Sequence, residues 1–377
     1  MNFRQGFWTP VLVIGFVLQL TSGALGQPEG ITIPVTLPPF DENHPACALP
    51  PDRERSLVFA QDNKRQFMQG VSFGLSSAAR DRGLTYSVLL ADNDATRALA
   101  QINSLHDRPV GGVVVAPVDS ESIGPHLRKL ILRGVYVGTI VPPPATTLLN
   151  APQYQTGHLL GEAAARHIRE RLAGRANVVI LSHDSLEFLA PRFTAMRDAL
   201  RQVPGATIVA DISPVTVDHQ GGFEMMKTIL VANPRIDVVL GADTVVLGAL
   251  AAMRAAGKAR PDQFFGGIDG EPEALMELRK TDSPYKTSIS LSSPIFGYAM
   301  GQHAADWLEG KSIPQAMDIL PRALTPETLA QYEEDGRNPG AVYRDETRRR
   351  QYLAMYGNIC FETRSNFIDF PWSSENR

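Results

Sequence analysis

The sequence predicts an α/β fold made of two doubly wound parallel-sheet lobes. From Ser56 to about residue 320, short apolar runs alternate with stretches of helical periodicity, which is typical of parallel sheets covered by helices on both faces. The apolar runs are too many for one open sheet of this kind. A Pro- and Thr-rich break at 142–152 divides them into two groups, so we place a lobe boundary near residue 151.

Nine apolar runs are predicted to be strands, because each is short and rich in β-branched residues. They are Leu57–Ala60, Tyr86–Ala91, Gly112–Ala116, Val135–Val141, Asn177–Leu181, Ala206–Ala210, Ile236–Gly241, Phe264–Ile268 and Thr287–Leu291. Between them apolar residues recur at helical spacing, as in Phe67, Val71, Leu75 and Ala78. A cleft is expected between the carboxyl ends of the strands, where small ligands bind.

The first 26 residues have the pattern of a secretory signal peptide. Arg4 precedes an apolar run from Val11 to Leu20, and the small residues that follow end at Gly26. We expect cleavage after Gly26 and export to the periplasm, without a lipid anchor because no cysteine stands at the cut. A buried N-terminal helix is the alternative. Residues 27–54 are rich in proline and lack periodicity, which predicts an extended tail.

The composition favours a globular protein that does not bind nucleic acid. The chain has 377 residues, 44% of them hydrophobic, which is enough for two domains with cores. Its formal net charge is −4, whereas contacts with phosphates need clustered Lys and Arg. The one such cluster, Arg348–Arg350, follows Asp345 and Glu346 and fits a solvated helix face.

The two cysteines, Cys47 and Cys360, are predicted to form a disulfide. An exported chain meets an oxidising compartment, and one cysteine near each end of the chain would fasten both tails. The alternative, a reactive thiol, would need a nearby base, and the sequence shows none.

The motifs in the sequence favour a protein that catalyses no reaction. Residues Gly70–Gly74 match the hydrolase nucleophile elbow, which needs a strand that ends directly at the serine. The predicted strand ends at Ala60, so Ser72 fits a helix better and a serine hydrolase is the remote alternative. The sequence has no phosphate loop, no Rossmann glycine triplet and no paired-histidine zinc motif. We therefore expect no metal and no cofactor.

From about Ser56 to Leu320 the chain resembles the periplasmic sugar-binding proteins of the ribose-binding type, which are substrate-binding components of ABC transporters. Five segments carry the resemblance in register: Leu57–Ala60, Gly74–Gly83, Val113–Ser120, Ala242–Leu250 and Gly267–Gly270. It implies a type I periplasmic binding fold with three hinge crossovers near residues 151, 290 and 320. The implied divisions are an N-terminal lobe of residues 55–151 plus 290–320, a C-terminal lobe of residues 152–289, and a C-terminal extension, 321–377, that packs on the body. Within the extension, the segments Pro326–Glu334 and Asp345–Met355 are expected to be helices.

The resemblance implies ligand contacts in the loop after the first strand, at Gln61, Arg65, Phe67 and Met68. Phe67 would stack on the apolar C–H face of a sugar, or it would pack in the core beside Val71. Arg65 would donate to hydroxyls or to a carboxylate, or it would be an exposed loop charge.

In the second lobe the resemblance implies contacts at Arg192, Asp243 and Asp269. Asp269 would accept hydrogen bonds from ligand hydroxyls, or it would cap a helix over Glu271–Arg279. Asp243 is expected to cap the helix that follows it.

Some positions depart from the family pattern. Polar or aromatic contacts of the relatives are replaced here by Ile140, Val141, Ala190, Val217 and Leu291, so a pocket built for ribose is not expected. The pocket is expected either to be less polar or to use other groups such as His183, Glu187 and His219. The predicted function is that of a monomeric exported protein that closes around a small polar, sugar-like solute and presents it to an ABC permease. The alternative is a receptor that reports the solute to a membrane sensor kinase.

Overall fold

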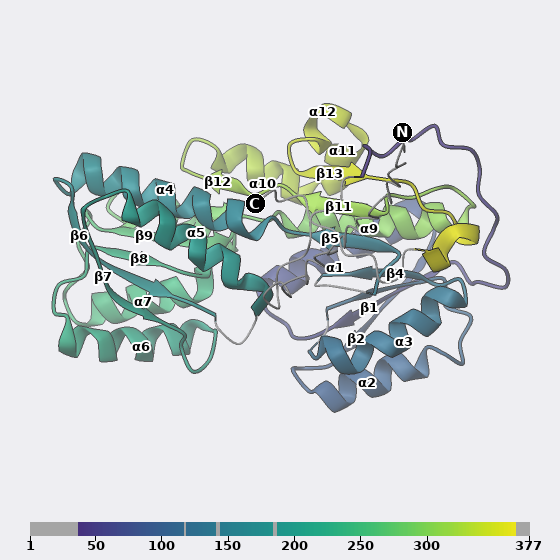
Figure 1. Cartoon of the computed structure of the whole chain (residues 1–377), viewed down its shortest axis with the longest axis horizontal. Coiled ribbons are helices and arrows are strands. Elements are labelled where there is room, and N and C mark those ends of the chain that lie inside the picture. Colours follow the sequence, from purple (N-terminus) through teal and green to yellow (C-terminus); the bar gives the residue numbers. More distant parts are fainter. Residues whose placement is uncertain (1–36, 117, 141–143, 184–186, 367–377) are drawn as a thin grey trace, which may run out of the picture.

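The computed structural model describes residues 37–116, 118–140, 144–183 and 187–366, which form two α/β lobes side by side (Figure 1). The predicted signal peptide and the first part of the predicted tail lie outside the described residues, as does Val141. The described part of the tail, 37–54, has no regular element. It lies against the body through hydrogen bonds such as Phe40 N to Met355 O, 3.0 Å.

The first lobe is built on a seven-stranded sheet in the order β13-β11-β5-β4-β3-β1-β2. The strands are β1 (Ser56–Gln61), β2 (Thr85–Leu90), β3 (Gly112–Val115), β4 (Tyr136–Thr139), β5 (Thr147–Asn150), β11 (Ala316–Ile319) and β13 (Leu353–Tyr356). All neighbours pair in parallel except β11 and β13. The central strands are apolar throughout, because helices cover both faces of the sheet.

The second lobe is built on a six-stranded sheet in the order β12-β10-β9-β8-β6-β7. The strands are β6 (Arg175–Leu181), β7 (Gly205–Ile212), β8 (Val238–Leu240), β9 (Phe264–Asp269), β10 (Tyr285–Ser290) and β12 (Arg322–Leu324). Only β12 runs antiparallel to its neighbour.

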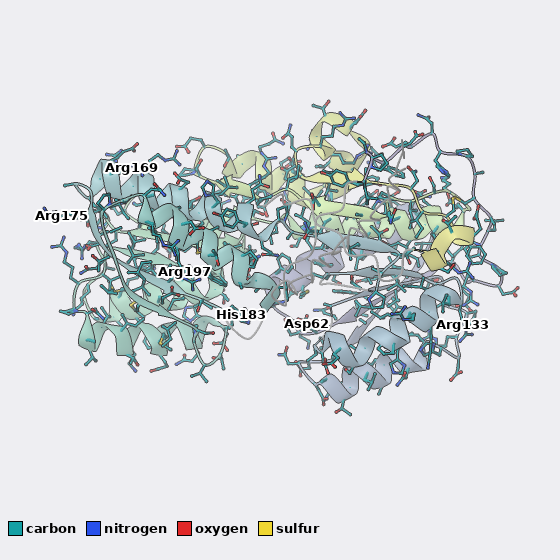
Figure 2. All side chains as sticks on the ribbon, viewed as in Figure 1. Asp62, Arg133, Arg169, Arg175, His183 and Arg197 are labelled. Carbon is teal, nitrogen blue, oxygen red and sulfur yellow. A yellow bond between two sulfur atoms is a disulfide. The ribbon has the colours of Figure 1, made fainter. Side chains whose placement is uncertain are left out.

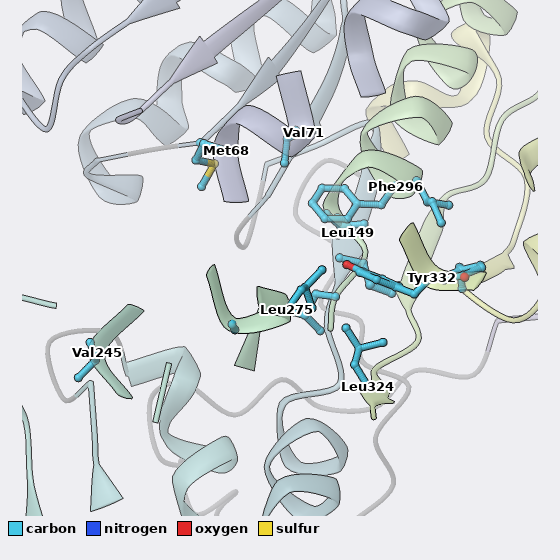
Figure 3. Packing of buried hydrophobic residues seen from close by; sticks show 14 of the residues in the cluster. Met68, Val71, Leu149, Val245, Leu275, Phe296, Leu324 and Tyr332 are labelled. Atoms are coloured by element: carbon cyan, nitrogen blue, oxygen red, sulfur yellow. The ribbon is translucent and has the colours of Figure 1, made fainter. Parts of the chain in front are cut away.

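Helices cover both faces of each sheet. In the first lobe α1 (Gln66–Arg82) packs with α9 (Ser293–Leu308) on one face, and α2 (Ala95–Ser104) and α3 (Ser120–Leu132) cover the other. In the second lobe α4 (Gln153–Arg171) and α5 (Ala190–Arg201) form one layer, and α6 (His219–Ala232) and α7 (Asp243–Ala255) form the other. Figure 3 shows buried side chains of one core cluster, which include Met68, Phe296 and Tyr332.

The predicted fold class is confirmed, including the three crossovers between lobes. The chain changes sheets between β5 and α4, between β10 and α9, and between β11 and β12. The structure also has a fourth passage that was not predicted, because β12 belongs to the second sheet and β13 to the first. The segment 321–377 was expected to pack on the body as an extension. Its described part lies on the body and adds one strand to each sheet. Its helix over residues 329–337 lies near the junction of the lobes, and its helix over residues 339–344 contacts α1 and α9 of the first lobe (Figure 1).

One predicted helix is wrong. Asp345–Met355 was expected to be helical, but only the single turn α12 (Glu346–Arg349) is, and Leu353–Tyr356 is strand β13. Antiparallel pairing with β11 decides the conformation there, which periodicity within the segment could not indicate. The other helices of this segment are α10 (Leu329–Arg337) and α11 (Pro339–Arg344), followed by the 3₁₀ turn η2 (Phe361–Asn366).

The disulfide between Cys47 and Cys360 is confirmed, with Cα atoms 5.4 Å apart. It joins the tail to the residues just before η2. His44 lies near both sulfurs, but the sulfurs are bonded to each other, so these residues are not a metal site. Among the helices of the described residues, none is long and apolar enough to cross a membrane.

Candidate functional site

A cavity of about 940 Å³ lies between the lobes, at the carboxyl ends of strands from both sheets. Its wall includes Asp62 after β1, Ala116 after β3, Ala242 after β8 and Asp269 at the end of β9. Parallel strands bring their carboxyl ends to one edge of a sheet, and in this molecule the two edges face each other. Figure 2 shows Asp62 and His183, both lining residues, on opposite sides of the junction.

The three predicted crossovers also border the cavity. Ala151, Leu291 and Ile319 line it: Ala151 and Leu291 directly follow β5 and β10, and Ile319 is the last residue of β11, each at a sheet change. A bend of the chain at these points would therefore change the width of the cavity.

The structure brings five of the seven predicted contact residues to the cavity wall. They are Arg65, Phe67, Met68, Arg192 and Asp269. Gln61 and Asp243 do not line this cavity, although both are buried next to it. The Gln61 amide donates to the backbone carbonyl of Asn63, so it holds the loop between β1 and α1 in place.

The loop after β1 presents a charge and an aromatic ring. Arg65 forms an ion pair with Asp62, 3.5 Å between Nη2 and Oδ2, and its guanidinium lies 6.0 Å from the centre of the Phe67 ring. Phe67 is half-buried and also contacts Phe296, with ring centres 5.8 Å apart. Phe67 thus packs against the core and also lines the cavity, and its stacking on a sugar stays a prediction. Met68 is buried in the same core cluster and reaches the cavity.

Arg192, which is buried, and Asp269, which is half-buried, carry opposite charges that act on each other in the second lobe. Arg192 lies near the start of α5, and its Nε donates to the Gln153 side-chain oxygen at 2.9 Å. Burial lowers the pKa of Arg192, an effect that the charge of Asp269 opposes. Burial raises the pKa of the Asp269 carboxyl, whereas Arg192 and Arg65 lower it. Each charge thus reduces the cost of burying the other.

Asp269 is held in a strained backbone conformation, with φ of 120°. Such conformations cost free energy and occur often at ligand sites. Helix α8 (Pro272–Leu278) has Glu271 as its N-cap residue, and no side chain caps it. The alternative role of Asp269 as a helix cap is therefore not observed, and the residue faces the cavity instead.

Asp243 has a structural role that differs from the predicted one. The N-cap residue of α7 is Ala242, so Asp243 does not cap that helix. Its carboxylate accepts hydrogen bonds from Tyr285 Oη at 2.5 Å, Ser288 Oγ at 2.7 Å and the Glu271 backbone N–H at 2.8 Å. Burial raises its pKa to about 7. Asp243 thus fixes the turn that carries Asp269.

The structure adds lining residues that sequence reasoning missed, among them Glu271, Gln153 and Phe188. Glu271 follows Asp269-Gly270 directly, so its position next to a predicted contact was the available signal. The predicted replacements His183 and His219 line the cavity, while the side chain of Glu187 lies outside the described part.

Three of the departures from the family pattern also line the cavity: Ile140, Val217 and Leu291. The wall is therefore apolar at positions where polar or aromatic contacts were replaced.

Ser72 does not have the surroundings of a catalytic serine. It lies inside α1 rather than at the end of a strand, and its Oγ hydrogen-bonds to Tyr86 Oη at 2.8 Å. It is not a lining residue of the cavity. The strand-to-helix turn that the nucleophile elbow requires is absent at this serine.

Comparisons with known proteins agree with this architecture. Residues 57–312 match the family described as periplasmic binding protein domain. The chain is 25% identical over 293 residues to the ribose import binding protein of Bacillus subtilis, covering 72% of this chain and 91% of the relative. It is 25% identical over 235 residues to a xylitol-binding protein of Mycolicibacterium smegmatis, covering 61% and 66%.

Solved structures share the fold. An ABC transporter solute binding protein from Bacillus halodurans with bound myo-inositol matches with a TM-score of 0.65 and 21% identity, covering 75% of this chain and 99% of the other. A periplasmic solute binding protein from Actinobacillus succinogenes with bound D-allose matches with a TM-score of 0.66 and 18% identity, covering 74% and 100%.

Proposed function

The chain belongs to the periplasmic binding protein domain family, and on that premise we propose that it captures a small hydroxylated solute for an ABC importer. The observation that supports this function is the cavity between the lobes, where the buried Arg192 and the half-buried Asp269 present opposite charges among apolar side chains. Ligand sites of this kind are mostly apolar and use a few fixed polar groups for orientation. A carboxylate and a guanidinium recognise hydroxyl groups through charge-assisted hydrogen bonds.

The proposed mechanism is closure of the lobes around the solute. A solute that contacts Phe67 in one lobe and Asp269 in the other does so fully only when the cavity is narrow. It therefore binds the closed form better and shifts the population toward it. Bending at the crossovers beside Ala151, Leu291 and Ile319 provides the movement. The protein binds and releases the solute unchanged, so no residue is assigned a catalytic role.

The ligand class and the partner are supported by the relatives. Their names and bound molecules include ribose, xylitol, myo-inositol and D-allose, all small polyhydroxylated compounds. Delivery to a permease, rather than to a sensor kinase, follows the relatives named as import binding proteins. The signal-peptide pattern supports a periplasmic location, and we propose that the mature protein acts as a monomer.

Thermal unfolding with a panel of pentoses, hexoses and polyols tests this function. A ligand at about 100 times its dissociation constant should stabilise the protein by about 2.7 kcal/mol, which gives a clear rise in the unfolding temperature. Asp269→Asn should abolish the rise, because it removes the charge that faces Arg192. Ser72→Ala should leave the rise unchanged, whereas a hydrolase that uses Ser72 would lose activity. If no compound on the panel shifts unfolding, the proposal of a sugar or polyol ligand is wrong.

A further inference from the structure

Glu271 is a buried carboxylate on the cavity wall that has no partner among the described residues. It precedes helix α8, lines the cavity and is only 8% exposed. Its backbone N–H donates to Asp243, but no described group donates to its own carboxylate or forms an ion pair with it. An ionised carboxylate that is buried without a partner is strongly unfavourable, so such a group either keeps its proton or pairs with a cation. The described part of the chain therefore leaves Glu271 in need of a partner.

The cavity wall carries more acidic than basic side chains. Seven lining residues are Asp or Glu, whereas three are Lys or Arg. Two of the three cations already face carboxylates, since Arg65 pairs with Asp62 and Arg192 opposes Asp269. The third, Lys64, is exposed. A cleft lined mainly by one sign of charge concentrates ligands of the opposite sign.

Charged groups from three neighbouring elements and from α8 itself act on Glu271. Burial is the main cause that raises the pKa of Glu271 to about 8. Asp269 at the end of β9 and Asp243 at the start of α7 add to the rise, Glu273 adds less, and Arg65 from the loop after β1 opposes it. In the ligand-free protein at pH 7 the carboxyl therefore keeps its proton, and a cation that binds beside it displaces that proton.

We propose that the ligand is an amino sugar or amino polyol whose ammonium group binds at the carboxylates of Glu271 and Asp269. This inference rests on the proposed solute-binding function and narrows its ligand class. An ammonium group carries several donors, so it can serve both carboxylates at once. The apolar side chains of Phe67 and Leu291 offer a surface for the C–H face of the carbon skeleton.

A neutral polyol provides a less complete set of partners for the two carboxyl groups. Its hydroxyls can donate to Asp269, but they bring no positive charge to balance the second carboxylate. Glu271 would then stay protonated and would act only as a neutral hydrogen-bond donor. The amine and the neutral polyol therefore predict different affinities and different proton balances.

Isothermal titration calorimetry with matched pairs of compounds tests whether the ligand carries an ammonium group. The probes are glucosamine against glucose, galactosamine against galactose, and an amino-deoxyinositol against inositol. N-acetylglucosamine is a further control, since it keeps the nitrogen but removes its charge. We expect at least one amine to bind roughly tenfold or more tightly than its neutral counterpart, because a buried charge pair is formed only with the amine.

Proton release provides a second readout that needs no variant. Titrations of the wild-type protein at pH 7 in buffers of different ionisation enthalpy count the protons exchanged on binding. Binding of the amine should release about one proton, because Glu271 must ionise to meet the ammonium group. Binding of a neutral sugar should release none. Tight amine binding without proton release would overturn the role of Glu271.

Two variants assign the effect to one residue. Glu271→Gln should remove the preference for the amine and the proton release, while Asp282→Asn removes one negative charge from an exposed site outside the cavity and should keep both. Thermal unfolding confirms that each variant is folded. If neutral sugars bind as tightly as the amines, the inference is wrong and the proposed function stands. If neither class binds, both are wrong.

Discussion

The disulfide between Cys47 and Cys360 should contribute a large share of the stability of the molecule. It closes a loop with a sequence separation of 313 residues. In the chain-entropy model a loop of this length destabilises the unfolded state by about 5.7 kcal/mol. Because measured disulfides often deliver less than this model, we expect the Cys47→Ser, Cys360→Ser double variant to lose about 3–5 kcal/mol.

Urea unfolding followed by tryptophan fluorescence measures this loss. Trp307 is a suitable reporter because it is fully buried, donates from Nε1 to the Gly134 carbonyl at 2.9 Å, and contacts Phe361, the residue next to Cys360, at 6.2 Å between ring centres. Wild-type protein in reductant is the matched control and should lose the same free energy. Ligand affinity should change by less than roughly threefold, since neither cysteine lines the cavity. A loss below about 1 kcal/mol would refute the entropic reasoning.

Two further predictions follow from buried groups near the cavity. Because the pKa of Asp243 is raised to about 7 in the folded protein, the free energy of unfolding should fall as pH rises from about 4 to 7, and Asp243→Asn should flatten this slope in urea titrations. Gly157→Ala would place a Cβ 1.8 Å from the Arg192 backbone oxygen, so it should cost about 1–3 kcal/mol by thermal unfolding and weaken ligand binding, whereas Gly336→Ala, with open space around it, should not destabilise.

The sequence was most informative where a segment is fixed by its own pattern. All nine predicted strands are present, because buried parallel strands are short apolar runs whatever they pair with. The four missed strands, β5, β11, β12 and β13, lie at or near sheet edges and have only three or four residues each. Their conformation depends on partners far away in the chain, so a local pattern could not indicate them.

In the candidate site, too, some residues could be predicted from the sequence and others could not. Phe67 and Asp269 could be placed because the family resemblance points to the loop region after β1 and to the end of β9, and both strands are recognisable in the sequence. The different surroundings of the Asp243 and Glu271 carboxyl groups could not be predicted. Asp243 looked like a helix cap and instead accepts hydrogen bonds from β10 and from the N-cap residue of α8. Glu271 looked like an ordinary helix residue and faces the cavity without a partner among the described residues. Which carboxylate is satisfied depends on tertiary contacts that no spacing in the sequence encodes.

The position of β13 has a consequence for how the protein folds. The first sheet contains strands from residues 56–61 and from residues 353–356, so it cannot be complete until almost the whole described chain is available. Contacts between such distant segments slow folding. Until β13 docks, β11 presents an open edge that can pair with another chain. Strand β13 therefore protects the edge of β11 only late in folding. Chains shortened before residue 353 should aggregate during refolding rather than fold into a smaller two-lobed protein.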